Sequence, residues 1–342
     1  MRLTYAGCNL FGQVPTSREL AIDHFQELPL EDDLIDIALG HSITVYLKKD
    51  GLYFHGHGLQ PRVTHQITKM DVPTQAKIKL VKTCDTSVLV LDDEGRLFVL
   101  DFLAKNPGFT IRLLKRSDAG MIDKVVDFAS GSTINVGLTQ TGMLYNFPVR
   151  LDFRLEENVK VKKMTAGYEH VVILDTAGNV YSFGNGRRGQ LGNGILEIQE
   201  TPRKIQVLEG IFITDVSTGG WHSMALSRDG DVYIWGWNGD GQIGLFDDHN
   251  DPLGVVSIPQ YLPLPGENLN VAHIAAGGRH SICITSDQIV FAYGCNKFNQ
   301  LGLPDFEMVV NKPTKVYEIS KEKKVLRVEA GPSSTVIITD EA

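Results

Sequence analysis

Short apolar stretches separated by turn residues recur along the chain, and almost none of it shows the apolar period of a helix. The stretches HVVIL (170–174), HSMAL (222–226) and HSICI (280–284) are each followed by a turn and by a second stretch rich in β-branched and aromatic residues. Such pairs, joined by Asp-Gly or similar turns, predict antiparallel strands. The sequence therefore predicts an all-β fold.

The strand pairs belong to a sequence repeat. Counted from the histidine that opens each stretch, a turn residue follows after 8 positions, a glycine after 14 and a glutamine after 20. Agreement at so many fixed offsets indicates a repeat architecture. The three sets are Gly178, Gly230 and Gln288 (a departure from glycine); Gly184, Gly236 and Gly294; and Gln190, Gln242 and Gln300.

Weaker copies of the repeat precede the clear ones, with turn glycines at 51, 95 and 142. The six turn positions are 36 to 58 residues apart. That spacing suits a propeller blade of four strands, which takes about 40–50 residues.

The two ends of the chain supply the halves of one further repeat. Gly7 stands in the glycine position of a back half, and Ser334 stands in the histidine position of a front half. A seventh blade formed by about 1–14 plus 325–342 would leave no free edge strand at that place. We therefore predict a seven-bladed β-propeller, with residues 1–342 as a single domain.

Register counting makes this prediction specific. Arg2–Ala6 should pair antiparallel with the strand around Thr335–Thr339, and Met1 should lie near Ala342. If the two ends were far apart, the seven-bladed arrangement would be wrong.

The composition limits the class of function. Hydrophobic residues make up 42% and charged residues 22% of the 342 residues, as in soluble globular proteins. No apolar run approaches the length of a membrane span, so we expect no membrane partner. The net charge of −8 argues against direct binding of nucleic acid. Four cysteines and the lack of an N-x-[ST] site fit a reducing compartment, the cytosol or the nucleus.

Two patterns that suggest catalysis or cofactor binding are better explained by the repeat. Gly184–Gly189 matches G-x-G-x-x-G, but a dinucleotide site needs that loop to open a helix, so these glycines are predicted to serve turns with φ > 0. His170, His222 and His280 occupy one position in successive repeats, and each is expected to form a hydrogen bond across a blade junction. Because no acid, base and metal-ligand set converges, we predict no enzyme activity, no cofactor and no metal site.

The pattern AGxxHS…L…DGxVYxWGxNxxGQLG resembles the repeat of the regulator of chromosome condensation family. The resemblance is strong over 160–342 and weak over 35–150, and it is greatest to a small single-propeller member. It implies a nuclear, chromatin-linked adaptor, with the cytoplasm as a second location. The implied partner is a Jumonji-type Fe(II)/2-oxoglutarate-dependent oxygenase connected with histone H3 lysine-36 methylation, with histones as further partners. The alternative function is guanine-nucleotide exchange on a Ran-type small GTPase.

The candidate binding residues occupy positions of the repeat at which the residue type differs between copies. The residue before each histidine is Glu169, Trp221 or Arg279, in a loop that opens on one face of a propeller. An aromatic side chain and an arginine in such loops suit an interface hot spot, and relatives in this family carry Trp and Arg in the same loop at an interface. For Trp221, the alternative is packing into a blade junction. The predicted partner-binding residues are Tyr168, Glu169, Arg187, Trp221, Trp237 and Arg279.

A proline-containing insert loop at 246–270 stretches one repeat and is the second candidate binding element. Long inserts are often functional. The alternative is a solvated connector.

Overall fold

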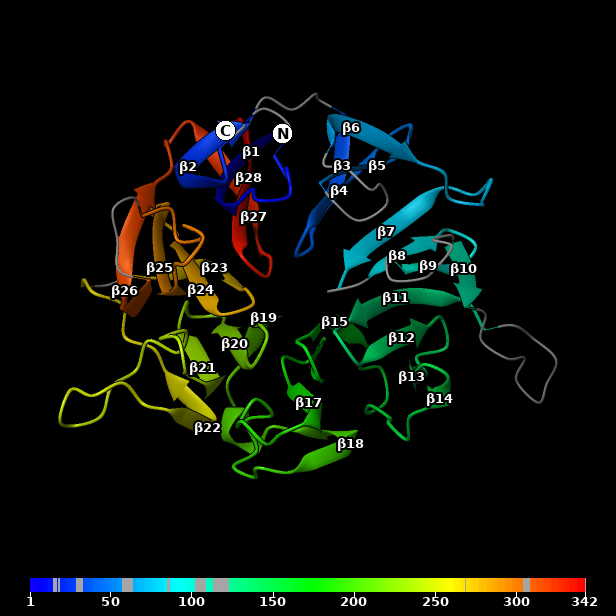
Figure 1. Ribbon diagram of the computed structural model, residues 1–342. Helices are drawn as coiled ribbons and strands as arrows, with labels where there is room; N and C mark the ends of the chain where they lie inside the picture. The colour runs from blue at the N-terminus through cyan, green and yellow to red at the C-terminus, as the bar shows by residue number, and fades with distance from the viewer. Residues whose placement is uncertain are drawn as a thin grey trace. The chain divides into compact units, whose positions relative to one another are not determined.

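Figure 1 shows the computed structural model of the protein, which describes residues 1–14, 17, 19–28, 33–56, 64–84, 87–101, 109–112, 123–267, 269–303 and 308–341. Apart from one 3-10 turn, η1 (Gln206–Leu208), the regular structure of these residues is β-strand. The strands form seven four-stranded sheets with antiparallel pairing. These sheets are the blades of a seven-bladed β-propeller, so the predicted fold class is confirmed.

The chain divides into two compact units, and each is described by itself. The second unit comprises Asn9–Leu20 and Leu30–Arg154. It holds three blades, whose strands are β3 (Leu34–Leu39), β4 (Ile43–Lys48), β5 (Gly51–Gly56) and β6 (Thr64–Met70); β7 (Ile78–Thr83), β8 (Ser87–Asp92), β9 (Leu97–Asp101) and β10 (Phe109–Arg112); and β11 (Val125–Ser130), β12 (Asn135–Thr139), β13 (Leu144–Asn146) and β14 (Val149–Arg150).

The first unit comprises Met1–Cys8, Ala21–Pro29 and Leu155–Ala342. Its four blades contain β15 (Val161–Ala166), β16 (His170–Asp175), β17 (Val180–Asn185) and β18 (Ile198–Lys204); β19 (Ile213–Thr218), β20 (His222–Ser227), β21 (Val232–Trp237) and β22 (Val255–Tyr261); β23 (Val271–Ala276), β24 (His280–Thr285), β25 (Ile289–Cys295) and β26 (Val309–Glu318); and β27 (Lys323–Ala330), β28 (Ser334–Glu341), β1 (Arg2–Cys8) and β2 (Ala21–Leu28).

The second strand of the blade is the core element. In β4, β8, β16, β20 and β24 every residue is buried. A strand covered on both faces carries a continuous apolar run instead of an alternating one. This explains the sequences VVIL, SMAL and ICIT, which do not alternate between apolar and polar residues.

The blade turns have a residue with positive φ in both units. All six predicted turn residues have positive φ, between 67° and 150°. Gln288, the departure from the repeat, has φ 67° and so keeps the conformation that glycine adopts elsewhere. Five of the six turns therefore share φ between 67° and 86°, including the one without glycine, and Gly51 departs from them at 150°.

Replacement of Gln288 by glycine is expected to stabilise the protein by about 1 kcal/mol, because a non-glycine residue at positive φ is strained. The Gln288 side chain contributes only a long hydrogen bond of 3.4 Å to the Ser320 carbonyl. Chemical denaturation of the variant measures the gain. Asp287→Gly is the matched control, because Asp287 is not among the residues with positive φ and glycine should lower stability there. Equal effects of the two substitutions would contradict the prediction.

The blade made from both ends of the chain has the predicted register. Arg2 pairs with Thr339 and Ala6 with Thr335, in antiparallel orientation. The amino group of Met1 lies 3.4 Å from the Asp340 carboxylate; Ala342 is outside the described residues. Gly7 pairs with Ser334, in the register that joins glycine and histidine in the clear repeats. The predicted pairing of the two terminal strands is confirmed.

The segment predicted as an insert, 246–270, contains a strand of its blade. Its residues Val255–Tyr261 form β22, which pairs with β21, and Phe246 and Pro252 form an isolated bridge. Part of this long segment is therefore ordinary blade structure, and the remainder connects blade strands.

Candidate functional site

Four loops of the first unit, each joining the first and second strands of a blade, form a connected backbone row. Tyr168 donates its backbone N–H to the Gly220 carbonyl at 3.1 Å, and Gly220 donates to Gly277 and Gly278 at 3.2 Å. Gly278 in turn donates to the Gly331 carbonyl at 3.0 Å. Each loop is thus hydrogen-bonded to the next through its backbone, and this network positions the side chains of the loops.

Glycine in this row allows the aromatic side chains to approach the backbone. A Cβ atom on Gly220 would lie 2.5 Å from the ring of Tyr168, so only glycine fits beneath that ring. The Tyr168 ring meets Trp221 edge to face, with centroids 5.4 Å apart and planes at 78°. This is a favoured geometry for aromatic pairs, because the positive edge of one ring faces the negative face of the other.

Two arginines lie over the tryptophans. The Arg188 guanidinium carbon is 4.5 Å from the Trp221 centroid and 5.0 Å from the Trp237 centroid. The Arg279 guanidinium carbon is 5.8 Å from the Trp237 centroid. Each such cation–π contact contributes about 0.5–1 kcal/mol at an exposed site. Tyr168, Trp221, Arg188, Trp237 and Arg279 are called the aromatic–arginine surface below.

The surface is accessible and carries positive charge. Arg188 and Arg279 are exposed, while Trp221 and Trp237 are half-buried. Arg279 is paired with the Asp240 carboxylate at 3.1 Å. Among the described residues, no carboxylate forms an ion pair with Arg188, so its N–H groups remain available while its plane is held against two indoles. Such an arginine is prepared to bind a carboxylate with little loss of entropy.

Exposed apolar residues adjoin the aromatic–arginine surface. Val255, 47% exposed, is the β22 residue opposite Trp237. The loop that carries Arg188 lies beside β22, because Gly194 donates its N–H to the Ser257 carbonyl at 2.9 Å. Ile195, Leu196 and Ile198 of that loop and of β18 are at least half exposed. Aromatic anchors with apolar neighbours and arginines are the composition of a protein–protein interface.

The structure brings four of the six predicted residues together: Tyr168, Trp221, Trp237 and Arg279. Glu169 is in the same loop as Tyr168, and its carboxylate accepts a hydrogen bond from Asn185 Nδ2 at 2.6 Å. Trp221 contacts Tyr168 of the neighbouring blade but is half-buried, so it combines features of both predicted environments.

Arg187 and Arg188 are neighbours in one loop. Arg187 is exposed, and its backbone N–H donates to Asn185 Oδ1 at 2.9 Å. Sequence reasoning missed Arg188, the residue that contacts both indoles. The repeat offers a signal for it, since Arg188 and Asp240 occupy the same position just before the fixed glycine and glutamine.

The glycine-rich loops have the structural role that was predicted. Gly184, Gly189, Gly236 and Gly241 all have positive φ. Gly184–Gly189 begins in the last two residues of β17 and leads towards the strand β18, whereas a dinucleotide fingerprint opens a helix. In the described part of the chain, no three histidine, cysteine, aspartate or glutamate side chains are grouped to hold a metal. Nor do the described residues include a helix of sufficient length and apolar character to cross a membrane.

The predicted hydrogen bonds of the three repeat histidines across blade junctions are confirmed. Nε2 of His170 lies 2.9 Å from Ser223 Oγ, and Nε2 of His222 lies 2.9 Å from Ser281 Oγ. His280 has the same relation to Thr335 at 3.0 Å.

The hydrogen-bond partners of the three histidines determine which ring nitrogen carries the proton. The hydroxyls of Ser223, Ser281 and Thr335 donate to the carbonyls of Gln190, Gln242 and Gln300, so each accepts its bond from histidine Nε2–H. Burial lowers the pKa of each histidine to about 3, which keeps the imidazoles neutral. The row is a structural element of the fold.

The repeat and the fold can now be compared with known proteins. Two family models, both described as the regulator of chromosome condensation (RCC1) repeat, match residues 177–226, 229–284 and 287–338, and residues 161–190, 213–242 and 271–300. Human RCC1 domain-containing protein 1 is 31% identical over 256 residues, which cover 62% of this chain and 68% of the relative. The chain belongs to the RCC1 repeat family.

Solved structures of similar fold include RCC1 proteins. Human WBSCR16 has a TM-score of 0.80 at 18% identity, with 100% of this chain and 99% of that chain covered. Prp20p of Saccharomyces cerevisiae has a TM-score of 0.78 at 18% identity, with 99% and 91% covered. At this identity the two comparisons show that the RCC1 propeller fold is shared. The family-model matches lie within 161–338, the region that carries the aromatic–arginine surface.

Proposed function

We propose that this RCC1 propeller is a non-enzymatic interaction protein that binds a partner protein through the aromatic–arginine surface. The observation that carries the proposal is Arg188, exposed, held over two half-buried indoles and without a carboxylate partner among the described residues. Trp and Arg are the residue types that dominate interface energetics. The adjoining exposed residues Val255 and Ile198 extend the contact area.

The partner proposed is a Jumonji-type Fe(II)/2-oxoglutarate-dependent oxygenase connected with histone H3 lysine-36 methylation, with histones as further partners. The support for this class of partner is the resemblance of the sequence to small single-propeller members of the family. On the same basis we propose that the protein acts in the nucleus as a chromatin-linked adaptor. The net charge of −8 supports a protein partner over direct binding of nucleic acid.

Replacement of Arg188 or Trp221 by alanine is expected to weaken the partner complex at least about tenfold, since an interface hot spot contributes about 2 kcal/mol or more. Folding should be retained, because Arg188 is exposed and Trp221 is only half-buried. Affinity purification with mass spectrometry identifies the partner, and calorimetric titration with the purified partner measures the loss for each variant.

Arg228→Ala is the matched control for Arg188→Ala. Arg228 also lies over an aromatic ring, 3.7 Å from the Phe212 centroid, but in the turn at the opposite end of the strands of its blade. This variant should bind the partner as the wild type does. Equal binding by the Arg188, Trp221 and Arg228 variants would refute the proposed surface, and unfolding of the Trp221 variant would make Trp221 a core residue.

Guanine-nucleotide exchange on a Ran-type small GTPase is the competing function. It is favoured by the shared fold with Prp20p, whose structure is described together with its binding to Gsp1p and histones. Release of labelled GDP from Ran separates the two functions. Acceleration by catalytic amounts of the protein would establish exchange activity and overturn the adaptor proposal.

A further inference from the structure

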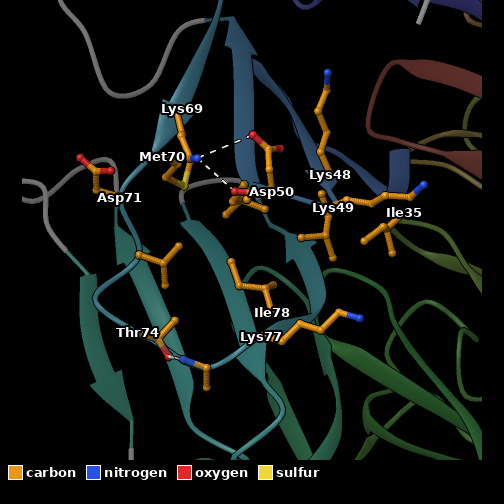
Figure 2. A pocket seen from close by; sticks show the side chains of 15 residues that line it. Ile35, Lys48, Lys49, Asp50, Lys69, Met70, Asp71, Thr74, Lys77 and Ile78 are labelled. Carbon is orange, nitrogen blue, oxygen red and sulfur yellow. Dashed lines mark hydrogen bonds and ion pairs between the residues drawn. The ribbon is translucent and has the colours of Figure 1, made fainter. Parts of the chain in front are cut away.

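A pocket of about 300 Å³ lies in the second unit, which shares no residue with the aromatic–arginine surface (Figure 2). Two segments form its walls. One is the turn between β4 and β5, around Asp50 and Gly51, and the other is the connection from β6 to β7, around Asp71–Ile78. The buried side chains of Leu52 and Met70 belong to its lining. A space of this size holds the equivalent of about ten water molecules, which is enough for a small polyatomic ligand.

The pocket is rich in lysine, although the chain as a whole is acidic. Four lysines line it, against two aspartates, Asp50 and Asp71. Figure 2 shows that these lysines come from β4 and the turn after it, from β6, and from the segment before β7. The lining lysines are Lys48, Lys49, Lys69 and Lys77.

Two of the lysines are already paired with carboxylates, and two are not. Lys48 Nζ lies 3.3 Å from an oxygen of Asp33. Lys69 Nζ lies 3.8 Å from Asp50 Oδ2 and donates to the Asp50 carbonyl at 3.0 Å. In the described part of the chain, Lys49 and Lys77 form no ion pair, and both are exposed. The pocket therefore presents two unpaired ammonium groups beside two paired ones.

An equivalent pocket in another blade lacks this charge. A pocket of about 280 Å³ lies at the turn glycine Gly230 and at the connection from Leu262 to Val271, the same places in its blade. Its described lining contains Asp231 and no lysine. A hollow between this turn and the following connection is thus a recurrent feature of the blade. The four lysines distinguish the pocket in the second unit from this pocket.

We propose that this lysine pocket binds a small anion of the diphosphate class. Lysine ammonium groups act as point charges and match phosphate oxygens in several directions. No arginine belongs to the described lining, so recognition of the anion would rest on ammonium groups. In Figure 2 the ammonium groups of Lys48, Lys49 and Lys77 point to different sides of the pocket, which favours an anion with more than one charged group, because each group can then meet a different lysine.

The test is calorimetric titration of the full chain with inorganic pyrophosphate at low ionic strength. One saturable site is expected, and the affinity should fall as salt is added. The double variant Lys49→Gln and Lys77→Gln should bind at least about tenfold more weakly, since it loses two charge-assisted contacts. Pyrophosphate should also raise the thermal midpoint of the wild type, through preferential binding to the folded state.

The double variant Lys321→Gln and Lys324→Gln is the matched control. It changes the net charge by the same amount at two exposed lysines outside the pocket lining, and its affinity should stay within about twofold of the wild type. The lack of a saturable site in the wild type, or equal weakening in the two double variants, would overturn the proposal. Inorganic sulfate should bind more weakly than pyrophosphate, and equal affinity would overturn the diphosphate assignment.

Discussion

Lowering the pH from about 7.5 to about 5.5 is expected to reduce the free energy of unfolding by about 4 kcal/mol. Burial lowers the pKa of His170, His222 and His280 from 6.5 to about 3. Below pH 6.5 each imidazole takes up a proton in the unfolded chain but stays neutral in the folded one. Each histidine therefore shifts the equilibrium towards unfolding by about 1.4 kcal/mol per pH unit. The contribution of the three histidines to stability is fully present above pH 6.5, their pKa in the unfolded chain. It is lost as the pH falls towards about 3, their pKa in the folded chain.

Other groups add to this pH dependence or oppose it. Burial also lowers the pKa of His273, which adds to the loss at acidic pH, and Asp215 partly opposes that shift. Burial raises the pKa of Asp127, so this single carboxyl acts in the opposite direction. The hydrogen bond from Lys315 lowers the pKa of Glu318 from its ordinary value of 4.5, so its contribution to stability is lost only as the pH falls below that value.

Denaturant unfolding followed by tryptophan fluorescence at the two pH values measures the effect. His222→Gln should reduce the pH dependence by about a third, because one of three equivalent groups is removed. His249→Gln is the control, since His249 is exposed, and it should leave the pH dependence largely unchanged. If the His222 variant retained the full dependence, the buried row would not be its origin.

Replacement of Gly184 by valine is expected to destabilise the protein by about 3 kcal/mol or more. Gly184 has φ 107° and pairs with His170. A Cβ atom there would lie 2.4 Å from the Glu169 carbonyl oxygen and 2.8 Å from the His170 Cα. Both are backbone atoms, so the strand pair has to move apart. Thermal or denaturant unfolding of the variant gives the loss.

Gly210→Val separates the two causes of that loss. Gly210 also has positive φ, 86°, but a Cβ atom there would meet no atom within 4 Å. Its substitution should cost only the conformational strain, about 1–2 kcal/mol. Equal losses at Gly184 and Gly210 would show that the contact with the Glu169 and His170 backbone is unimportant.

The buried histidines and the candidate surface are linked through the chain. Trp221 and Arg279 each precede a histidine whose imidazole is bonded to the next blade. The fixed residue anchors the loop, and the preceding residue is thereby held at the surface. In a repeat of this kind the residue before the histidine can differ from blade to blade while the histidine stays the same. The histidine is buried, whereas the residue before it is at least partly exposed.

Several features of the site could be predicted from the sequence because they follow from the repeat. Counting offsets placed the six turns, and the residue at each of them has positive φ. The same counting placed the histidines in separate blades, where each bonds to the next blade. Arg188 was missed because its importance depends on contacts with the indoles of Trp221 and Trp237, which belong to the next blade.

The sequence by itself determined the all-β class, the seven blades and the pairing of Arg2–Ala6 with Thr335–Thr339. These follow from a hydrophobic and glycine pattern of fixed period, in which local turn chemistry and strand register leave one consistent arrangement. Only the tertiary structure decided which long side chains meet. The contact of Arg188 with Trp237, and the collection of Lys49 and Lys77 around one pocket, join residues from different strands and loops. Such contacts depend on side-chain conformations and loop positions that no period in the sequence records.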